Sequence, residues 1–182
     1  MSAKFASCSG GRLFLAILPD TAAAERIHRL AGILKRAHRF NGKPIAADRL
    51  HVSLFSLTGL PDRQIYAACE AASELRAEPF EVSFDRTASF RSGAGNRPFV
   101  LIGEQGLRRL QSFRQMLAVA LSRRGLRRQA STSFTPHVTL LYDARHVDEY
   151  PIEPVVWTVA EFVLVHSLKG HRHLERWCLQ AG

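Results

Sequence analysis

Two short stretches of the sequence share one pattern, and this pattern constrains the fold more than any other feature. Residues 50–57 read LHVSLFSL and residues 136–142 read PHVTLLY. In both, a His-Val-hydroxyl-Leu run alternates between two side-chain faces, which is typical of a strand with one buried face. The shared pattern suggests a weak internal duplication, in which each half of the fold contains one such strand.

Helix and strand patterns fill the rest of the chain on either side of Pro79. Before it, the expected order is strand, helix, strand, helix, at residues 12–18, 21–38, 50–57 and 62–77. After it, the order is strand, strand, helix, strand, strand, strand, at residues 80–85, 98–102, 105–124, 137–142, 155–168 and 174–179. Asp20 and Asp62 are candidate N-caps, and Gly125 is expected to end the third helix. The mixture of elements predicts the α+β class.

The composition is that of a globular protein. Of the 182 residues, 46% are hydrophobic and 23% are charged, which is enough for one domain or two small lobes. No apolar run approaches the roughly 20 residues that cross a bilayer, so we expect no membrane partner. Residues 1–10 carry no pattern and are expected to be disordered, whereas residues 11–182 are expected to form a single bilobal domain and a monomer.

The cysteines and the net charge limit the possible settings of the protein. Three cysteines without a CxxC pair fit free thiols in a reducing compartment, so we expect a cytoplasmic location. The formal net charge is +9, with arginine pairs at residues 108–109, 123–124 and 127–128. Such an excess favours polyanions such as RNA or phosphorylated metabolites, although each pair also fits a solvated helix surface.

The two patterned strands carry residues suited to chemistry at phosphorus. His51 and Ser53 share one face of the first strand, and His137 and Thr139 share one face of the second. If both faces line one cleft, one imidazole can act as an acid and the other as a base near neutral pH. The hydroxyls can donate hydrogen bonds to phosphate oxygens. No metal or other cofactor is required, because the histidines transfer the protons.

Other interpretations remain open from the residues alone. A single histidine on a half-buried strand is usually structural. The shared pattern raises the support for a catalytic role only to the level of the structural interpretation. His166, His171 and His173 cluster near the C-terminus, and the last two would share a strand face suited to a metal. No cysteine or carboxylate at convincing ligand spacing supports a metal there, so a solvated strand is favoured.

The motifs HVSL and HVTL resemble the paired His-x-Thr/Ser motifs of the 2H phosphoesterase superfamily. Beyond about residue 11, nearly the whole chain is similar to the RNA 2′,3′-cyclic phosphodiesterases, also called 2′-5′ RNA ligases. The similar segments, in order, are RLFLAILPD, ADRLHVSLFSL, RPFVLIGE, FTPHVTLLY and FVLVHSLKGHRHLERWCL. The resemblance implies a bilobal structure with pseudo-two-fold related lobes, antiparallel sheets lining a central cleft, and helices outside.

The resemblance also implies a reaction and a role for each residue. His51 would donate a proton to the leaving ribose 3′ oxygen, and His137 would activate water. The expected activity is metal-independent hydrolysis of 2′,3′-cyclic phosphates, on RNA ends or nucleotides, to 2′-phosphomonoesters, with Ser53 and Thr139 holding the phosphate. Many relatives have an arginine where this chain has Tyr142. Tyr142 is therefore a candidate substrate contact, and either another arginine supplies the charge or the substrate differs.

Two further functions fit the same resemblance. The reverse reaction, 2′-5′ RNA ligation, would use the same residues by microscopic reversibility. A non-catalytic RNA-binding module would keep the fold and bind RNA in a salt-dependent way without turnover.

Overall fold

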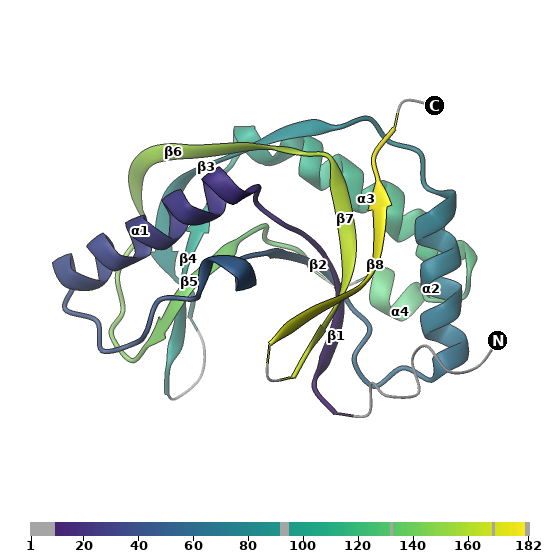
Figure 1. Ribbon diagram of the computed structural model, residues 1–182, viewed down its shortest axis with the longest axis horizontal. Helices are drawn as coiled ribbons and strands as arrows, with labels where there is room; N and C mark the ends of the chain where they lie inside the picture. Colours follow the sequence, from purple (N-terminus) through teal and green to yellow (C-terminus); the bar gives the residue numbers. More distant parts are fainter. Residues whose placement is uncertain (1–9, 92–94, 132, 169, 181–182) are drawn as a thin grey trace.

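Eight strands form two antiparallel sheets of four strands each in the computed structural model, which describes residues 10–91, 95–131, 133–168 and 170–180 (Figure 1). The first sheet has the order β2-β1-β7-β8. Its strands are β1 (Arg12–Ile17), β2 (Val52–Ser56), β7 (Glu161–Ser167) and β8 (His171–Cys178). The second sheet has the order β5-β4-β3-β6. Its strands are β3 (Phe80–Ser89), β4 (Arg97–Ile102), β5 (Val138–Asp143) and β6 (Tyr150–Val159).

The helices connect the two sheets so that the halves interlock. The longer helices are α1 (Thr21–Ala37), α2 (Asp62–Glu74) and α3 (Arg108–Arg123). Shorter turns are η1 (Ala47–Arg49), η2 (Gln105–Leu107) and α4 (Arg127–Ala130). Helix α1 follows β1 of the first sheet but packs against β5 and β6 of the second. Helix α3 follows β4 of the second sheet and packs against both sheets, because its Phe113 ring lies 5.4 Å from that of Phe80 on β3 and 5.3 Å from that of Phe162 on β7. The two four-stranded sheets, each with its helices, confirm the α+β class and the two lobes.

Local signals explain where the first and third helices begin and end. The Asp20 carboxylate accepts a hydrogen bond from the Ala23 amide at 2.8 Å, which confirms its N-cap role. Gly125 has φ +84, the left-handed conformation that terminates helices, just after α3. The second expected cap is wrong, because Asp62 is the first residue of α2 and Pro61 occupies the cap position.

Several boundaries differ from the sequence prediction, among them the end of α2 at Glu74 and the end of β3 at Ser89. Residues 155–168 do not form one stretch, because the chain passes at Ala160 from β6 to β7, which pair with β3 and β1 in different sheets. Strand β8 begins at His171 rather than at residue 174, because His171 pairs with Ser167. Residues 127–130 form α4, although no element was predicted between the helix at residues 105–124 and the strand at residues 137–142. The expected disorder of residues 1–10 concerns, apart from Gly10, residues outside the described part of the chain.

The two histidine-bearing strands are anchored in the same core. Val52, Val138 and Leu140 are 0% exposed, and Leu54 is 3% exposed. Burying each of these side chains stabilises the fold by about 1.5–3 kcal/mol. Because side chains alternate along a strand, this burial turns the histidine and hydroxyl faces of both strands away from the core.

Candidate active site

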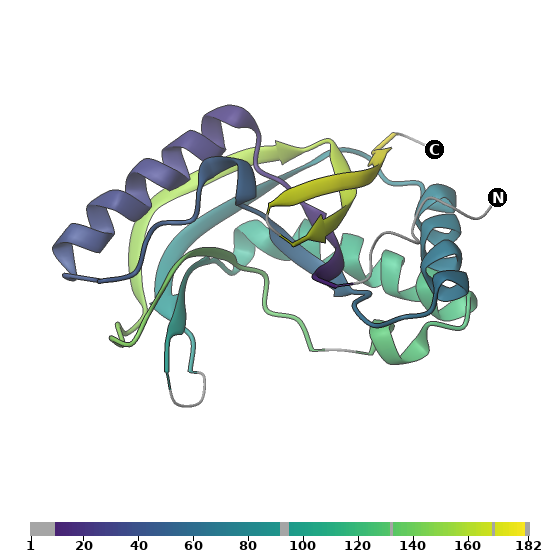
Figure 2. The same ribbon diagram turned by 60° about the horizontal axis from the view of Figure 1, so that its bottom comes forward.

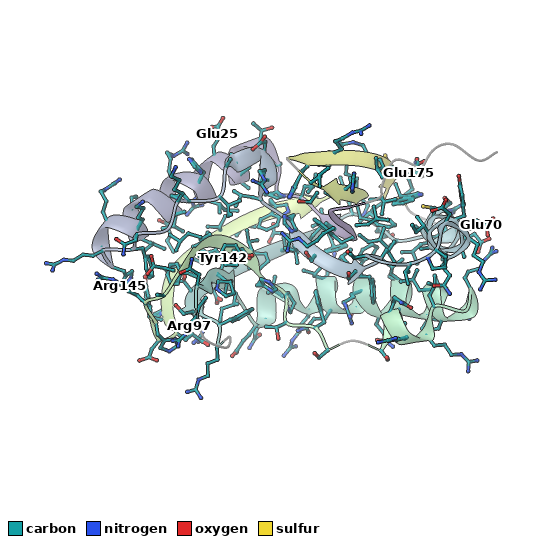
Figure 3. The ribbon with its side chains drawn as sticks, turned by 90° about the horizontal axis from the view of Figure 1, so that it is seen from below. Glu25, Glu70, Arg97, Tyr142, Arg145 and Glu175 are labelled. Carbon is teal, nitrogen blue, oxygen red and sulfur yellow. The ribbon has the colours of Figure 1, made fainter. Side chains whose placement is uncertain are left out.

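A pocket of about 170 Å³ lies between the two sheets. It is lined by residues of both halves: Arg12, Ile45, Arg49, His51, Ser53, His137, Thr139, Tyr142 and His171. All five residues that the sequence singled out for chemistry or binding therefore lie together. In Figure 3, which views the molecule from below, Tyr142 of β5 is labelled to the left of Glu175 of β8. Hollows of about 350 and 340 Å³ along α3 are larger, but neither is lined by a histidine.

The two histidine rings are held in equivalent ways. The Nδ1 atom of His51 lies 2.8 Å from the carbonyl oxygen of Arg49, and the Nδ1 atom of His137 lies 2.7 Å from that of Thr135. A carbonyl oxygen only accepts, so each Nδ1 carries a proton and donates it. Each ring therefore keeps its Nε2 atom for proton exchange with a bound molecule.

An aromatic ring supports each histidine from the side. The Phe14 ring centroid lies 4.8 Å from that of His51, and the Phe90 centroid lies 4.9 Å from that of His137. These contacts, together with the Nδ1 hydrogen bonds, restrict the rotation of both imidazoles. Two fixed imidazoles facing one small pocket can act as a proton donor and a proton acceptor on the same substrate.

Two arginines in the pocket were missed by the sequence analysis. Arg12 begins β1, and Arg49 ends η1, two residues before His51. The buried Nε atom of Arg49 has no hydrogen-bond partner among the described residues. No local pattern marked either residue, because Arg49 lies in a 3₁₀ turn rather than a strand, and Arg12 reaches the pocket only through the pairing of β1 in the sheet. Both arginines line the same pocket as Ser53, and they bring positive charge to a pocket in which Tyr142 carries no charge.

The environment of His51 favours its neutral form. Burial lowers the pKa of His51 below its ordinary value of 6.5, and the hydrogen bond to the Arg49 carbonyl opposes this effect. The charges of Arg12, His137 and Arg49 lower the pKa further. A bound anion would offset these charges and favour the protonated form of His51.

The C-terminal histidines are separated by the fold. His166 is buried, and its Nε2 atom lies 2.8 Å from the carbonyl oxygen of Gly10, which is a structural contact. His171 instead lines the pocket, with its ring centroid 5.0 Å from that of His51. Within the described part of the chain, no group of three or more His, Cys, Asp or Glu residues is arranged to hold a metal ion.

One carboxylate fixes the loop that forms a wall of the pocket. The Asp143 side chain, 4% exposed, accepts hydrogen bonds from the backbone amides of Asn41, Gly42 and Arg145, at 2.6, 2.8 and 2.9 Å. Burial acts to raise the pKa of Asp143, but these three bonds hold it below its ordinary value of 3.8. The Ile45 amide then donates to the Leu140 carbonyl oxygen at 2.7 Å, which positions Ile45 at the pocket.

Glycine is required at the closest point of this loop. A Cβ atom added to Gly42 would lie 2.0 Å from the carbonyl oxygen of Tyr142. The loop therefore approaches β5 at a distance that no side chain allows.

A buried arginine connects the segments that carry the two histidines. Arg114 of α3 is 8% exposed, and its Nε atom donates to the Leu54 carbonyl oxygen of β2 at 3.2 Å. Its guanidinium lies 4.3 Å from the Phe55 ring centroid and 4.5 Å from that of Phe134. Phe134 belongs to the segment between α4 and His137, which runs past α3 in Figure 2. This contact ties the approach to the second histidine to the strand of the first.

Comparisons with known proteins identify the family of the chain. A family model described as the 2′-5′ RNA ligase superfamily matches residues 18–171. The chain belongs to this superfamily. It is 31% identical over 179 residues to a protein named RNA 2′,3′-cyclic phosphodiesterase from Escherichia coli strain K12, covering 92% of this chain and 96% of that relative.

Solved structures confirm the 2H phosphoesterase fold. The crystal structure of Escherichia coli LigT complexed with 3′-AMP matches with a TM-score of 0.73 and 30% identity, over 93% of this chain and 98% of LigT. The structure of TT0787 of Thermus thermophilus matches with a TM-score of 0.72 over 93% and 98% of the two chains, but at 22% identity it shows the fold alone. Among the described residues, no helix has the length and apolar character to span a membrane.

Proposed function

We propose that this protein is a metal-independent RNA 2′,3′-cyclic phosphodiesterase that produces 2′-phosphomonoesters. The observation that carries the proposal is the equivalent fixing of His51 and His137, each through Nδ1, at one small pocket. The hydroxyls of Ser53 and Thr139 and the charges of two arginines complete the set. The 2′-5′ RNA ligase superfamily membership supports the choice of substrate.

The proposed hydrolysis needs two proton transfers. The Nε2 atom of His137 takes a proton from water as the water oxygen bonds to phosphorus. The bond from phosphorus to the ribose 3′ oxygen breaks, and the Nε2 atom of His51 gives that oxygen its proton. The product keeps the phosphate on the 2′ oxygen. Each acid or base role contributes about 10²- to 10⁴-fold to the rate.

Many of the proteins that this chain resembles carry an arginine at the position of Tyr142, so here the charge has to come from other residues. We propose that Arg12 and Arg49 hold the non-bridging phosphate oxygens, together with Ser53 and Thr139. The charges of both arginines lower the pKa of free His51. A bound cyclic phosphate carries a negative charge that opposes them. Substrate binding therefore favours the protonated His51 that the reaction needs.

An RNA partner is supported by the charge distribution around α3. The sequence contains no acidic residue between Glu104 and Asp143. Arg124 is paired with Glu70 and Glu74, but the same stretch contributes Arg123 and Arg127 to a hollow of about 350 Å³ between α3 and α4. We propose that this surface attracts the body of an RNA substrate. The single bilobal domain over residues 11–182, the monomeric state and the cytoplasmic location stay predictions.

The deciding experiment is hydrolysis of 2′,3′-cyclic nucleotides in the presence of EDTA. The variants His51→Ala and His137→Ala should each lose at least about 10²-fold in kcat. His146→Ala is the matched control, because His146 is absent from the pocket lining and its ring contacts Asp148. Phosphorus NMR of the product should show a 2′-phosphate. Activity retained by either pocket variant, or a 3′-phosphate product, refutes the assigned roles.

The two alternatives give different results in the same preparation. A ligase would join RNA ends through a 2′-5′ bond at a rate comparable to that of hydrolysis. The rates of ligation and of hydrolysis are therefore both measured. A binding module would show salt-dependent RNA binding that both histidine variants retain, with no turnover by the wild-type protein.

A further inference from the structure

The face of the first sheet that carries Arg12 and Phe14 extends beyond the proposed catalytic residues onto β8. Across the sheet, Arg12 pairs with Ser167, which pairs with His171. In the neighbouring row, Phe14 pairs with Val165, which pairs with His173. Residues directly opposite in adjacent strands point to the same face.

These two histidines therefore lie on the face that carries Arg12 and Phe14. The Phe14 ring lies between two imidazoles, with centroids 4.8 Å from His51 and 5.9 Å from His171. His173 follows about 7 Å farther along β8, at the usual rise of a strand. The face thus continues from the phosphate pocket along β8.

Both β8 histidines carry nitrogen atoms that lack a partner. The Nδ1 atom of His171 and the Nε2 atom of His173 are buried, and neither makes a hydrogen bond to the described residues. The Arg176 guanidinium donates to the Nδ1 atom of His173 at 2.7 Å. An arginine has only donors, so this nitrogen accepts, and the neutral ring carries its proton on Nε2. His173 therefore offers an unused donor.

Both rings are neutral at neutral pH. Burial and the nearby charge of His51 lower the pKa of His171 to about 4. Burial also lowers the pKa of His173, and the Arg176 charge adds to that effect. A neutral imidazole offers one donor and one acceptor, which suits a neutral polar ligand better than an anion. Buried polar atoms without partners are uncommon in folded proteins, and contacts among the described residues do not explain these two nitrogens.

We propose that His171 and His173 form a subsite for the nucleobase of the nucleotide whose cyclic phosphate occupies the pocket. A nucleobase is planar, is neutral, and presents donors and acceptors along its edge, which matches two neutral imidazoles. It is attached to the ribose beside the phosphate, and His171 lines the pocket proposed to hold that phosphate, with His173 next on the same face of β8. This subsite rests on the proposed function, because it assumes a nucleoside 2′,3′-cyclic phosphate in the pocket.

The test compares substrates with and without a base. The wild type and the variants His171→Phe and His173→Phe, which keep a ring but lose its nitrogens, are assayed on the four nucleoside 2′,3′-cyclic phosphates. The abasic substrate is 1-O-methylribose 2′,3′-cyclic phosphate. For at least one nucleotide, each variant should raise KM about tenfold, the effect of one lost hydrogen bond, with kcat changed less than about threefold. The KM for the abasic substrate should not change.

Arg172→Ala is the matched control. Arg172 lies between the two histidines in the sequence, is exposed, and points to the opposite face of β8. It should leave both kinetic constants unchanged on every substrate. An equal rise in KM for the abasic substrate would instead assign the histidines to the phosphate or ribose. Unchanged KM for all four nucleotides would remove them from binding. Either result overturns the proposal.

A binding measurement separates this proposal from the proposed function. Calorimetric titration with a nucleoside 2′-monophosphate and with 1-O-methylribose 2-phosphate needs no turnover. Tighter wild-type binding of the nucleotide, lost in both phenylalanine variants, supports the subsite even if no substrate is hydrolysed. Equal affinity for the two ligands refutes the subsite even if hydrolysis is observed.

Discussion

The buried carboxylate of Asp143 gives the sharpest stability prediction. It accepts three backbone hydrogen bonds, two at Oδ2 from Asn41 and Gly42 and one at Oδ1 from Arg145. In Asp143→Asn, one oxygen becomes an NH₂ group, which cannot accept. The amide oxygen can serve the pair from Asn41 and Gly42, so the bond from Arg145 is lost.

The magnitude follows from the loss of that one bond. A hydrogen bond to a charged group is worth about 1.5–3 kcal/mol, so the free energy of unfolding should fall by at least that amount. At about 2–4 °C per kcal/mol for a chain of this size, Tm should fall by about 3–12 °C. Urea unfolding followed by circular dichroism measures the change, and the m-value should stay constant.

The difference between wild type and Asp143→Asn should depend on pH. The three bonds hold the pKa of folded Asp143 below 3.8, so the carboxylate stabilises the wild type above that pH. This contribution is lost as the pH falls through the folded pKa, whereas the asparagine variant has nothing comparable to lose. The two unfolding curves should therefore converge in acid.

A matched substitution checks the reasoning about Asp143. Asp148→Asn removes a carboxylate whose side chain is 98% exposed and whose contact is to His146. It should change stability by less than about 0.5 kcal/mol. If Asp143→Asn is equally mild at neutral pH, the three backbone bonds do not fix the loop.

Three further predictions concern arginine side chains. Arg49→Gln should raise the pKa of His51 in the free protein, because the Arg49 charge lowers that pKa, and NMR titration of the imidazole measures the change. The same variant should raise KM for cyclic nucleotides in steady-state kinetics. Arg114→Met should lower the free energy of unfolding by about 1–3 kcal/mol, because the Leu54 carbonyl loses its charged donor, and an unchanged urea midpoint would contradict this. The double variant Arg127→Gln/Arg128→Gln should weaken RNA binding and reduce its salt dependence while leaving cyclic-nucleotide hydrolysis unchanged, which filter binding at several salt concentrations can test.

The sequence predicted the two histidine strands because their own residues contain the information. Val52 and Leu54, like Val138 and Leu140, alternate with the polar residues, and burial of these four confirms which face is internal. A period-two pattern states which side chains share a face but not which strand lies beside it. The division of residues 155–168 between two sheets at Ala160 was missed for this reason.

The same limit explains why the β8 histidines were interpreted as a solvated strand. The run His171-Arg172-His173 contains no apolar residue, so nothing in it indicates burial. Its place beside the pocket follows from pairing with β7, and β7 in turn pairs with β1. Arg12 lies at the pocket through the second of these pairings. These positions are set by tertiary contacts that no local pattern contains.

The position of the pocket arginines links phosphate binding to proton transfer. An arginine at the position of Tyr142 would stand on β5, in the half that provides His137. Here Arg12 and Arg49 stand on the half that provides His51, and their charges lower its pKa. We infer that free His51 is neutral at neutral pH and gains its proton when an anionic phosphate neutralises the arginines. A neutral substrate analogue, such as a methyl phosphotriester of the cyclic phosphate, would lack this effect. Its leaving oxygen should therefore be protonated inefficiently at neutral pH, and its hydrolysis should recover as the pH is lowered towards the pKa of free His51.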